Sequence, residues 1–135
     1  MKYALITGAN KGIGLETAKQ LLQQDYFVFL ASRDAQRGQE ALDHLRAQGL
    51  TQVELVLMDV TDQESIQTAR QTIGQRVQAL DALINNAGVP SPMPQTPLDT
   101  AIADYERVMN TNYLGAVAVT QTFMNLLWQS PTLAL

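Results

Sequence analysis

The stretch Thr7-Gly8-Ala9-Asn10-Lys11-Gly12-Ile13-Gly14 decides the fold. It follows a short apolar run and precedes a segment with apolar residues at helical spacing, so it predicts a turn between a β-strand and an α-helix. Glycines in such a turn permit a sharp reversal, the close approach of a pyrophosphate and tight packing of the helix on the strand. The N–H groups and dipole at the helix N-terminus also favour phosphates. The spacing Gly-x-x-x-Gly-x-Gly differs from the more common Gly-x-Gly-x-x-Gly.

Outward from this turn, apolar runs alternate with helical patterns. The runs predict strands at residues 3–7, 26–31, 53–58 and 82–85. The helical patterns cover residues 15–24, 35–48 and 102–128, and a further helix opens with the capping-box spacing Thr61-Asp62-Gln63-Glu64. Strands separated by helices imply parallel crossovers, so the sequence predicts an α/β fold in one domain over residues 1–135.

Composition excludes several classes of protein. The 135 residues include 9 basic and 13 acidic side chains, a net charge of −4 that gives no reason to expect nucleic acid or an anionic membrane as partner. The absence of cysteine excludes disulfides and thiolate sites and fits a cytoplasmic location. We expect no signal peptide and no membrane helix, because amides interrupt the uncharged segment after Arg107. We expect no metal site either, and His44 is predicted to be a solvated side chain.

Two motifs together resemble the short-chain dehydrogenase/reductase family. The glycine turn resembles the family's Thr-Gly-x-x-x-Gly-Ile-Gly signature, and Asn85-Asn86-Ala87-Gly88 resembles its second signature after the fourth strand. Asp59-Val60 matches the position at which the family contacts adenine. The resemblance implies a Rossmann-type parallel sheet in the order 3-2-1-4 with helices on both faces. It also implies cofactor contacts from these residues: Gly8, Asn10, Lys11, Gly12, Ile13, Gly14, Arg33, Asp59, Val60, Asn86, Ala87 and Gly88.

A narrower likeness concerns the cofactor. Three segments look like the carbonyl reductase branch: residues 10–14, Ser32-Arg33-Asp34 with Arg37-Gly38-Gln39, and Thr111-Asn112-Tyr113-Leu114-Gly115. In that family, cations at the positions of Arg33 and Lys11 grip the 2′-phosphate of NADP, and an Arg forks well onto phosphate oxygens. NADP is therefore predicted. The alternative cofactor is NAD, with Asp34 accepting a hydrogen bond from its ribose. A further alternative is that Arg33 and Asp34 only form a solvated strand end and bind no cofactor.

The catalytic chemistry of the family is only partly represented. The family uses a Tyr with a Lys four residues later, a Ser and an Asn, and Asn112 matches that Asn. Asn112 has an alternative reading, in which it only satisfies a backbone group beside the sheet. The lysines are Lys2, Lys11 and Lys19, so no tyrosine has a Lys at the required spacing. The Ser, Tyr and Lys follow a fifth strand in the family, and we expect this chain to be truncated before that strand.

The sequence therefore predicts the cofactor-binding half of an NADP-dependent oxidoreductase that acts on a small-molecule carbonyl or alcohol substrate. The alternatives are a non-catalytic nucleotide-binding or dimerisation module and a nonfunctional fragment. Truncation would leave the fourth strand as an open edge, and the last helix carries apolar residues around most of its circumference. We therefore expect self-association through that helix or that strand.

Overall fold

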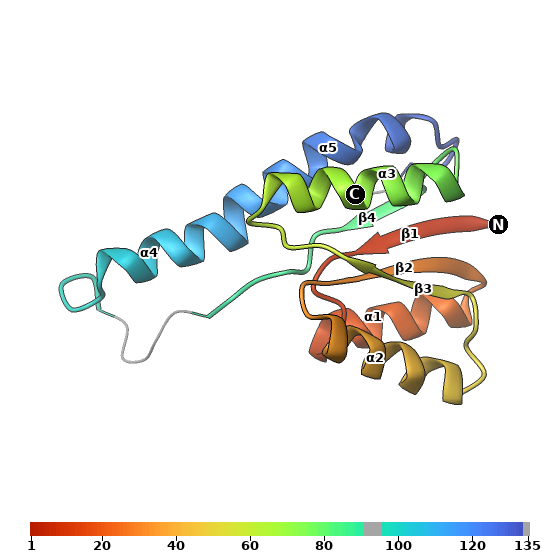
Figure 1. Ribbon diagram of the computed structural model, residues 1–135, viewed down its shortest axis with the longest axis horizontal. Coiled ribbons are helices and arrows are strands. Elements are labelled where there is room, and N and C mark those ends of the chain that lie inside the picture. The colour runs from red at the N-terminus through yellow and green to blue at the C-terminus, as the bar shows by residue number, and fades with distance from the viewer. Residues whose placement is uncertain (91–95, 134–135) are drawn as a thin grey trace.

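The fold is a four-stranded parallel sheet, seen in a computed structural model that describes residues 1–90 and 96–133 (Figure 1). The strand order is β3-β2-β1-β4. The strands are β1 (Lys2–Ile6), β2 (Tyr26–Ser32), β3 (Val53–Leu57) and β4 (Ala82–Ile84). Both the α/β class and the predicted order are confirmed. Within the described ranges β4 pairs only with β1, so no strand covers its other edge.

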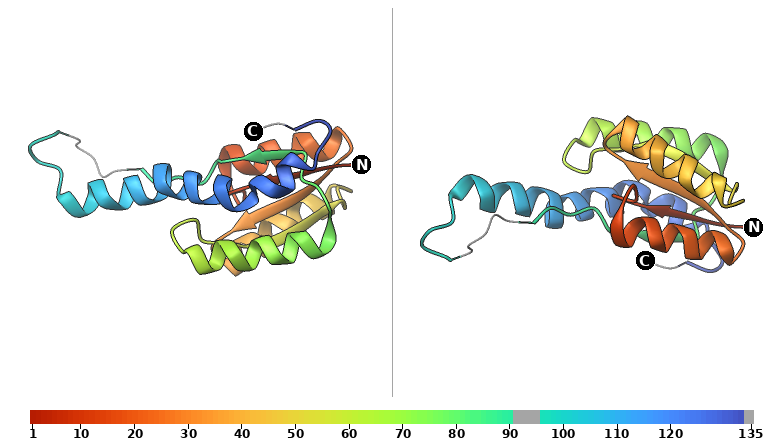
Figure 2. Two further views of the ribbon diagram at one scale, coloured as in Figure 1. Left: turned by 90° about the horizontal axis from the view of Figure 1, so that it is seen from above. Right: turned by 90° about the horizontal axis from the view of Figure 1, so that it is seen from below.

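Helices cover both faces of the sheet, as predicted. Helices α1 (Gly12–Gln23) and α2 (Ala35–Ala47) lie on one face, and α3 (Gln63–Arg76) and α5 (Ala116–Trp128) lie on the other (Figures 1 and 2). Adjacent strand residues therefore point into different apolar layers. Leu5 packs with Phe123 on the α3–α5 side, whereas Ile6 packs with Leu45 on the α1–α2 side. Burial on both faces explains why the strands read as continuous apolar runs.

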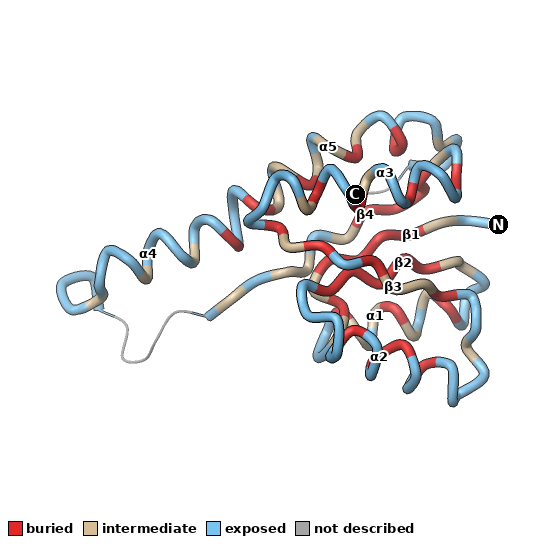
Figure 3. Tube along the Cα trace, in the orientation of Figure 1, coloured by how far each residue is buried: buried red, intermediate tan, exposed pale blue. Residues whose placement is uncertain are grey.

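The last helical segment is continuous over the predicted range but is not uniform. It consists of α4 (Ile102–Met109), a π-helical turn η1 (Asn110–Gly115) and α5. The body of the molecule buries one face of α5, whereas α4 projects beyond the sheet and has no buried residue along its fully described length (Figures 1 and 3). Across residues 1–90 and 96–133, no helix combines the length and apolar character that crossing a membrane requires.

The predicted capping box at the start of α3 is wrong. Asp62 is the N-cap, and its carboxylate accepts a hydrogen bond from the Glu64 N–H at 3.0 Å. The Thr61 hydroxyl instead donates to Asp59 Oδ1 at 2.7 Å. The Thr61 N–H also donates to Asp59 Oδ1, at 2.9 Å, so both groups hold Thr61 in the turn before the helix and Asp62 takes the N-cap position. Several other bounds shift by one residue, and the largest shift is at α1, which begins at Gly12 rather than at residue 15.

Candidate cofactor site

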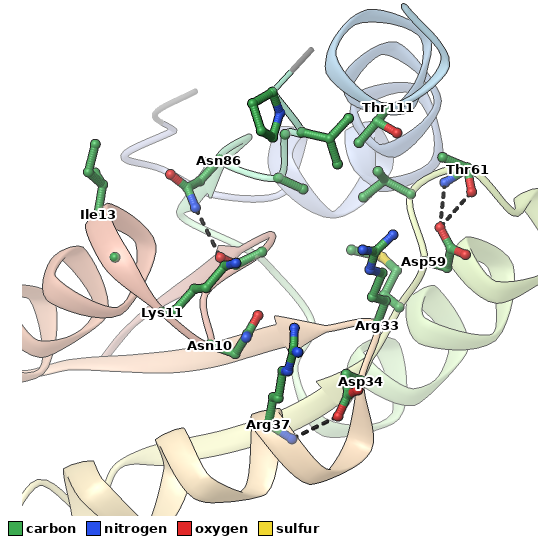
Figure 4. Close-up of a pocket in the computed structure, with 18 of the residues that line it drawn as sticks. Asn10, Lys11, Ile13, Arg33, Asp34, Arg37, Asp59, Thr61, Asn86 and Thr111 are labelled. Atoms are coloured by element: carbon green, nitrogen blue, oxygen red, sulfur yellow. Dashed lines mark hydrogen bonds between the residues drawn. The ribbon is translucent and has the colours of Figure 1, made fainter. Parts of the chain in front are cut away.

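A cavity of about 700 Å³ lies at the carboxyl ends of the strands (Figure 4). In an open parallel sheet, ligands bind at this edge, beside the point where the strand order reverses, which is between β1 and β4 here. The cavity brings together every cofactor residue predicted from the sequence except Gly14. Its wall includes Gly8, Asn10, Lys11, Gly12, Ile13, Arg33, Asp59, Val60, Asn86, Ala87 and Gly88.

The glycine turn forms the floor of the cavity between β1 and α1. Gly12 has a φ of +57° and open space where a Cβ would stand, so a ligand can approach its backbone closely. Gly14 lies on the first turn of α1, outside the cavity wall. A Cβ on Gly14 would collide with the Asn86 side chain, so this glycine serves the packing of α1 against the segment after β4.

The N-terminus of α1 faces the cavity without a side-chain cap. Lys11 is the N-cap residue in extended conformation, and the first turn holds no acidic side chain. The first N–H groups of a helix have no partner within the helix and carry a partial positive charge. This end of α1 is therefore suited to an anion such as a pyrophosphate.

Thr7 ties the two motifs together at the base of the cavity. Its hydroxyl oxygen accepts hydrogen bonds from the Asn86 N–H at 3.0 Å and the Ala87 N–H at 2.9 Å. The Asn86 amide in turn donates to the carbonyl oxygens of Thr7 at 3.2 Å and Gly8 at 3.1 Å. The sequence prediction did not assign Thr7 a site role. The feature that could have identified Thr7 is its place as the first residue of the glycine motif.

The cations that line the cavity include Lys11 at the start of α1, and Arg33 and Arg37 near the start of α2. Figure 4 shows Arg33 and Arg37 directed into the cavity from the end of β2 and the first turn of α2. The prediction missed Arg37 as a site residue. Four residues after Arg33, it reaches the same cavity because α2 begins directly after β2. This end of the cavity is suited to a second anionic group.

Asp34 has a structural role beside these cations. It is the N-cap of α2, and its Oδ1 accepts a hydrogen bond from the Arg37 N–H at 2.8 Å. The Ser32 hydroxyl donates to the Asp34 carbonyl oxygen at 2.9 Å, which fixes the backbone of this corner. One oxygen of the carboxylate is therefore already engaged, which weakens the case for Asp34 as a ribose ligand.

Asp59 lies at the end of β3 and remains negatively charged. The Thr61 hydroxyl is the main cause that lowers its pKa, against burial, which raises it. The Thr61 N–H, at 2.9 Å from Oδ1, and the charge of Arg33 lower the pKa further. A fixed carboxylate at this position can accept a hydrogen bond from a ligand amino group.

Asn112 lies behind the cavity wall rather than in it. Its side chain accepts a hydrogen bond from the Val89 N–H and donates to the Val89 carbonyl oxygen. Its neighbour Thr111 is buried and lines the cavity, and Arg107 donates to the Pro90 carbonyl oxygen at 2.9 Å. These contacts match the alternative prediction, in which Asn112 forms hydrogen bonds with backbone groups.

Comparison with known proteins agrees with this geometry. The family model described as short chain dehydrogenase matches residues 2–132. The chain is 36% identical over 134 residues to the short-chain dehydrogenase/reductase tropE of Talaromyces stipitatus, covering 96% of this chain and 49% of that protein. It is 35% identical over 130 residues to retinol dehydrogenase 11 of Mus musculus, covering 96% and 40%. The chain thus spans about half the length of the curated relatives it matches.

Solved structures share the fold. An NADPH-bound carbonyl reductase from chicken fatty liver superposes with a TM-score of 0.82 at 34% identity, over 94% of this chain and 52% of that one. An actinorhodin polyketide ketoreductase with NADPH superposes with a TM-score of 0.85 at 30% identity, over 93% and 47%. The family model and these relatives together show that the chain belongs to the short-chain dehydrogenase family.

Proposed function

We propose that residues 1–135 form the NADP-binding domain of an oxidoreductase that transfers hydride between NADPH and a carbonyl or alcohol substrate. The observation that carries the proposal is the group of three cations, Lys11, Arg33 and Arg37, beside a glycine turn at the switch point of the sheet. A 2′-phosphate is the one feature that distinguishes NADP from NAD, and Arg side chains bind phosphate oxygens strongly. The carbonyl reductase and the polyketide ketoreductase with NADPH add support from relatives.

The strand order suggests how the dinucleotide would lie. The pyrophosphate would meet the N-terminus of α1, next to Gly12. The adenosine half would then extend over β2 and β3, where Arg33 faces the 2′-phosphate and Asp59 with Val60 faces the adenine ring. The nicotinamide half would extend toward β4, along Gly88 and Val89.

The chemistry at the nicotinamide end is a proposal by descent. Bound NADPH would supply the hydride. This chain's residues would hold the cofactor and shape one side of the substrate space, through Val89, Pro90 and Thr111. Asn112 would act by fixing Val89. A non-catalytic nucleotide-binding module is the second candidate, and the hydrogen bonds of Asn112 to the Val89 backbone, through both the oxygen and the nitrogen of its carboxamide, favour it for this chain taken alone.

The test is calorimetric titration of the purified chain with NADPH and NADH, repeated for Arg33→Ala. We expect the unmodified chain to bind NADPH more tightly than NADH, by about tenfold or more, because a charge-assisted hydrogen bond contributes about 1.5–3 kcal/mol. Arg33→Ala should lose most of this preference. Equal affinities in the unmodified chain would contradict the proposal. Turnover of a carbonyl substrate would distinguish the oxidoreductase from the non-catalytic module.

A cytoplasmic location remains a prediction. The cysteine-free sequence supports it, because such proteins need no oxidising compartment. Fractionation of cells that express the chain would test it.

A further inference from the structure

The π-helical turn η1 connects two walls of the cavity. Within it, Thr111 is 9% exposed and lines the cavity, and Asn112 fastens Val89 on the β4 side. At its other end, Gly115 is buried against Val60, which follows β3. Single π-helical turns within α-helices are rare and frequently mark functional sites. The turn η1 therefore contacts the segment after β4 through Asn112 and the segment after β3 through Gly115.

The backbone of Gly115 does not need a glycine. Its φ of −62° and ψ of −46° are ordinary right-handed helical values, which alanine adopts more readily than glycine. The close packing of η1 against Val60, however, does require a glycine at this position. A Cβ on Gly115 would lie 2.8 Å from Val60 Cγ2 and 3.1 Å from the Val60 carbonyl oxygen. A methyl group at this place would have to displace either η1 or the backbone of Val60.

Val60 has little freedom to move except toward the cavity. It is 8% exposed, and it packs in the apolar layer under α3 and α5 while also lining the cavity. Its neighbours in sequence are fixed, because the Asp59 N–H donates to the Ser65 hydroxyl at 2.9 Å and Thr61 binds the Asp59 carboxylate. Pressure from η1 on Val60 would therefore narrow the β3 end of the cavity.

We propose that Gly115 is a positioning residue for the adenosine end of the cofactor site. By lacking a Cβ, it lets η1 lie against Val60 without pushing that wall into the space of the adenine ring. The inference rests on the proposed function, because that function assigns the β3 end of the cavity to adenosine. It adds a residue that contacts no cofactor and acts only through Val60.

The test compares Gly115→Ala with Gly74→Ala. Gly74 lies in α3, where a Cβ would meet only the end of the flexible Arg70 side chain, so it controls for the effect of Gly→Ala in a helix. Two ligands are titrated into each variant: NADPH and adenosine 2′,5′-bisphosphate, which has no nicotinamide. We expect Gly115→Ala to weaken both ligands by the same factor, about tenfold. Gly74→Ala should leave both affinities unchanged.

A double variant tests whether Val60 transmits the effect. Val60→Ala removes Cγ2, the atom nearest to the added methyl group. In the Val60→Ala background, the loss caused by Gly115→Ala should fall to less than about threefold. If Gly115→Ala alone does not fold, a folded double variant that binds adenosine 2′,5′-bisphosphate supports the proposal, and failure of the double variant to fold overturns it.

The remaining outcomes separate the two proposals. If the unmodified chain binds both ligands and Gly115→Ala binds them equally well, the role of Gly115 is overturned and the proposed function stands. A Gly115→Ala loss confined to NADPH also overturns it, because the effect would then lie at the nicotinamide end. If the unmodified chain binds neither ligand, the proposed function itself fails, and the role of Gly115 fails with it.

Discussion

Asn112 holds the backbone of Val89 with both halves of its carboxamide. Asn112 Oδ1 accepts from the Val89 N–H at 2.8 Å, and Asn112 Nδ2 donates to the Val89 carbonyl oxygen at 3.0 Å. Only a side-chain amide offers an acceptor and a donor in this arrangement. The pair joins η1 to the segment that follows β4 and lines the cavity, so a side chain of the last helical segment helps to fix the position of the cavity wall.

Asn112→Asp should weaken NADPH binding by about three- to tenfold and leave adenosine 2′,5′-bisphosphate binding unchanged. The carboxylate keeps the acceptor but loses the donor and faces the Val89 carbonyl oxygen, which costs about 1 kcal/mol. Calorimetric titration of both ligands is the measurement. Asn110→Asp, at an exposed position in the same turn, is the matched control. Equal losses of affinity for both ligands would contradict the prediction, because the effect of Val89 on binding would then extend beyond the nicotinamide end.

Arg37→Ala should reduce NADPH affinity by about tenfold or more and leave NADH affinity within about twofold. The reason is that Arg37 lines the cavity next to Arg33, where the 2′-phosphate would lie. Arg46→Ala, near the far end of α2, removes the same charge from the same helix and serves as control. Parallel titrations at low and high salt should show the difference shrinking as salt rises. Loss of NADH affinity in Arg37→Ala would place Arg37 elsewhere on the cofactor.

Asp34→Ala should lower the free energy of unfolding by about 1 kcal/mol without reducing NADPH affinity. Its carboxylate caps α2, and its negative charge does nothing to attract a phosphate. Asp62→Ala removes the corresponding cap of α3 and should cost about the same in urea unfolding. If Asp34→Ala instead abolished NADH binding, the alternative prediction of an NAD-binding carboxylate would be correct.

The membership of the cavity could be predicted because it follows from position along the chain, whereas the strand order was predicted from the resemblance to the short-chain dehydrogenase/reductase family. Parallel strands send their carboxyl ends to one edge, so motifs that follow β1, β2, β3 and β4 meet there whatever the loops do. The apolar runs marked those strands to within one or two residues, because strands covered on both faces carry few polar side chains.

The errors concern side-chain competition, which spacing does not encode. The pattern Thr61 to Glu64 has capping-box spacing, but Asp62 caps the helix and Thr61 is held in the preceding turn by the Asp59 carboxylate. A uniform helix over residues 102–128 fits the apolar periodicity, but the π-helical turn arises where Gly115 meets Val60 and Asn112 meets Val89. Both contacts join segments far apart in the sequence, so no local pattern records them.

Self-association of the chain remains a prediction, and the exposed apolar side chains along α4 and η1 support it. Ile102 is 70% exposed, Met109 51% and Leu114 51%, and helices seldom leave such a series of residues without a partner. Sedimentation velocity should show dimers or larger species that dissociate on dilution. The double change Met109→Lys and Leu114→Lys should shift the distribution to monomer. A concentration-independent monomer of the unmodified chain would contradict the prediction.

Asp81 should make the free energy of unfolding of the chain depend on pH in the acidic range. It accepts hydrogen bonds from the Tyr3 N–H at 2.8 Å and the Ser130 hydroxyl at 2.6 Å, and thereby joins β1 to the end of α5. Burial raises the pKa of Asp81, but the hydrogen bonds from Ser130, Tyr3 and Thr132, together with the charge of Lys2, outweigh burial and lower the pKa overall. The folded chain therefore favours the charged carboxylate.

The sign of the effect follows from this lowered pKa. The contribution of Asp81 is fully present above the unfolded-state pKa of about 3.9, and it is lost as the pH falls from there through the lower folded-state value. Asp81→Asn should cost about 1.5–3 kcal/mol in urea unfolding at neutral pH, because the hydrogen bonds lose their charge assistance. Below about pH 4 the difference between Asp81→Asn and the unmodified chain should shrink, because the protonated Asp81 then resembles Asn.

Asp43→Asn is the control, since Asp43 is exposed on α2 and accepts only the Gln39 side-chain amide within the described contacts. Its free energy of unfolding should follow that of the unmodified chain at every pH to within about 0.5 kcal/mol. A difference between Asp81→Asn and the unmodified chain that stays constant into acid would mean that the charge of Asp81 adds nothing, and that the hydrogen-bond acceptors of its side chain carry the whole effect.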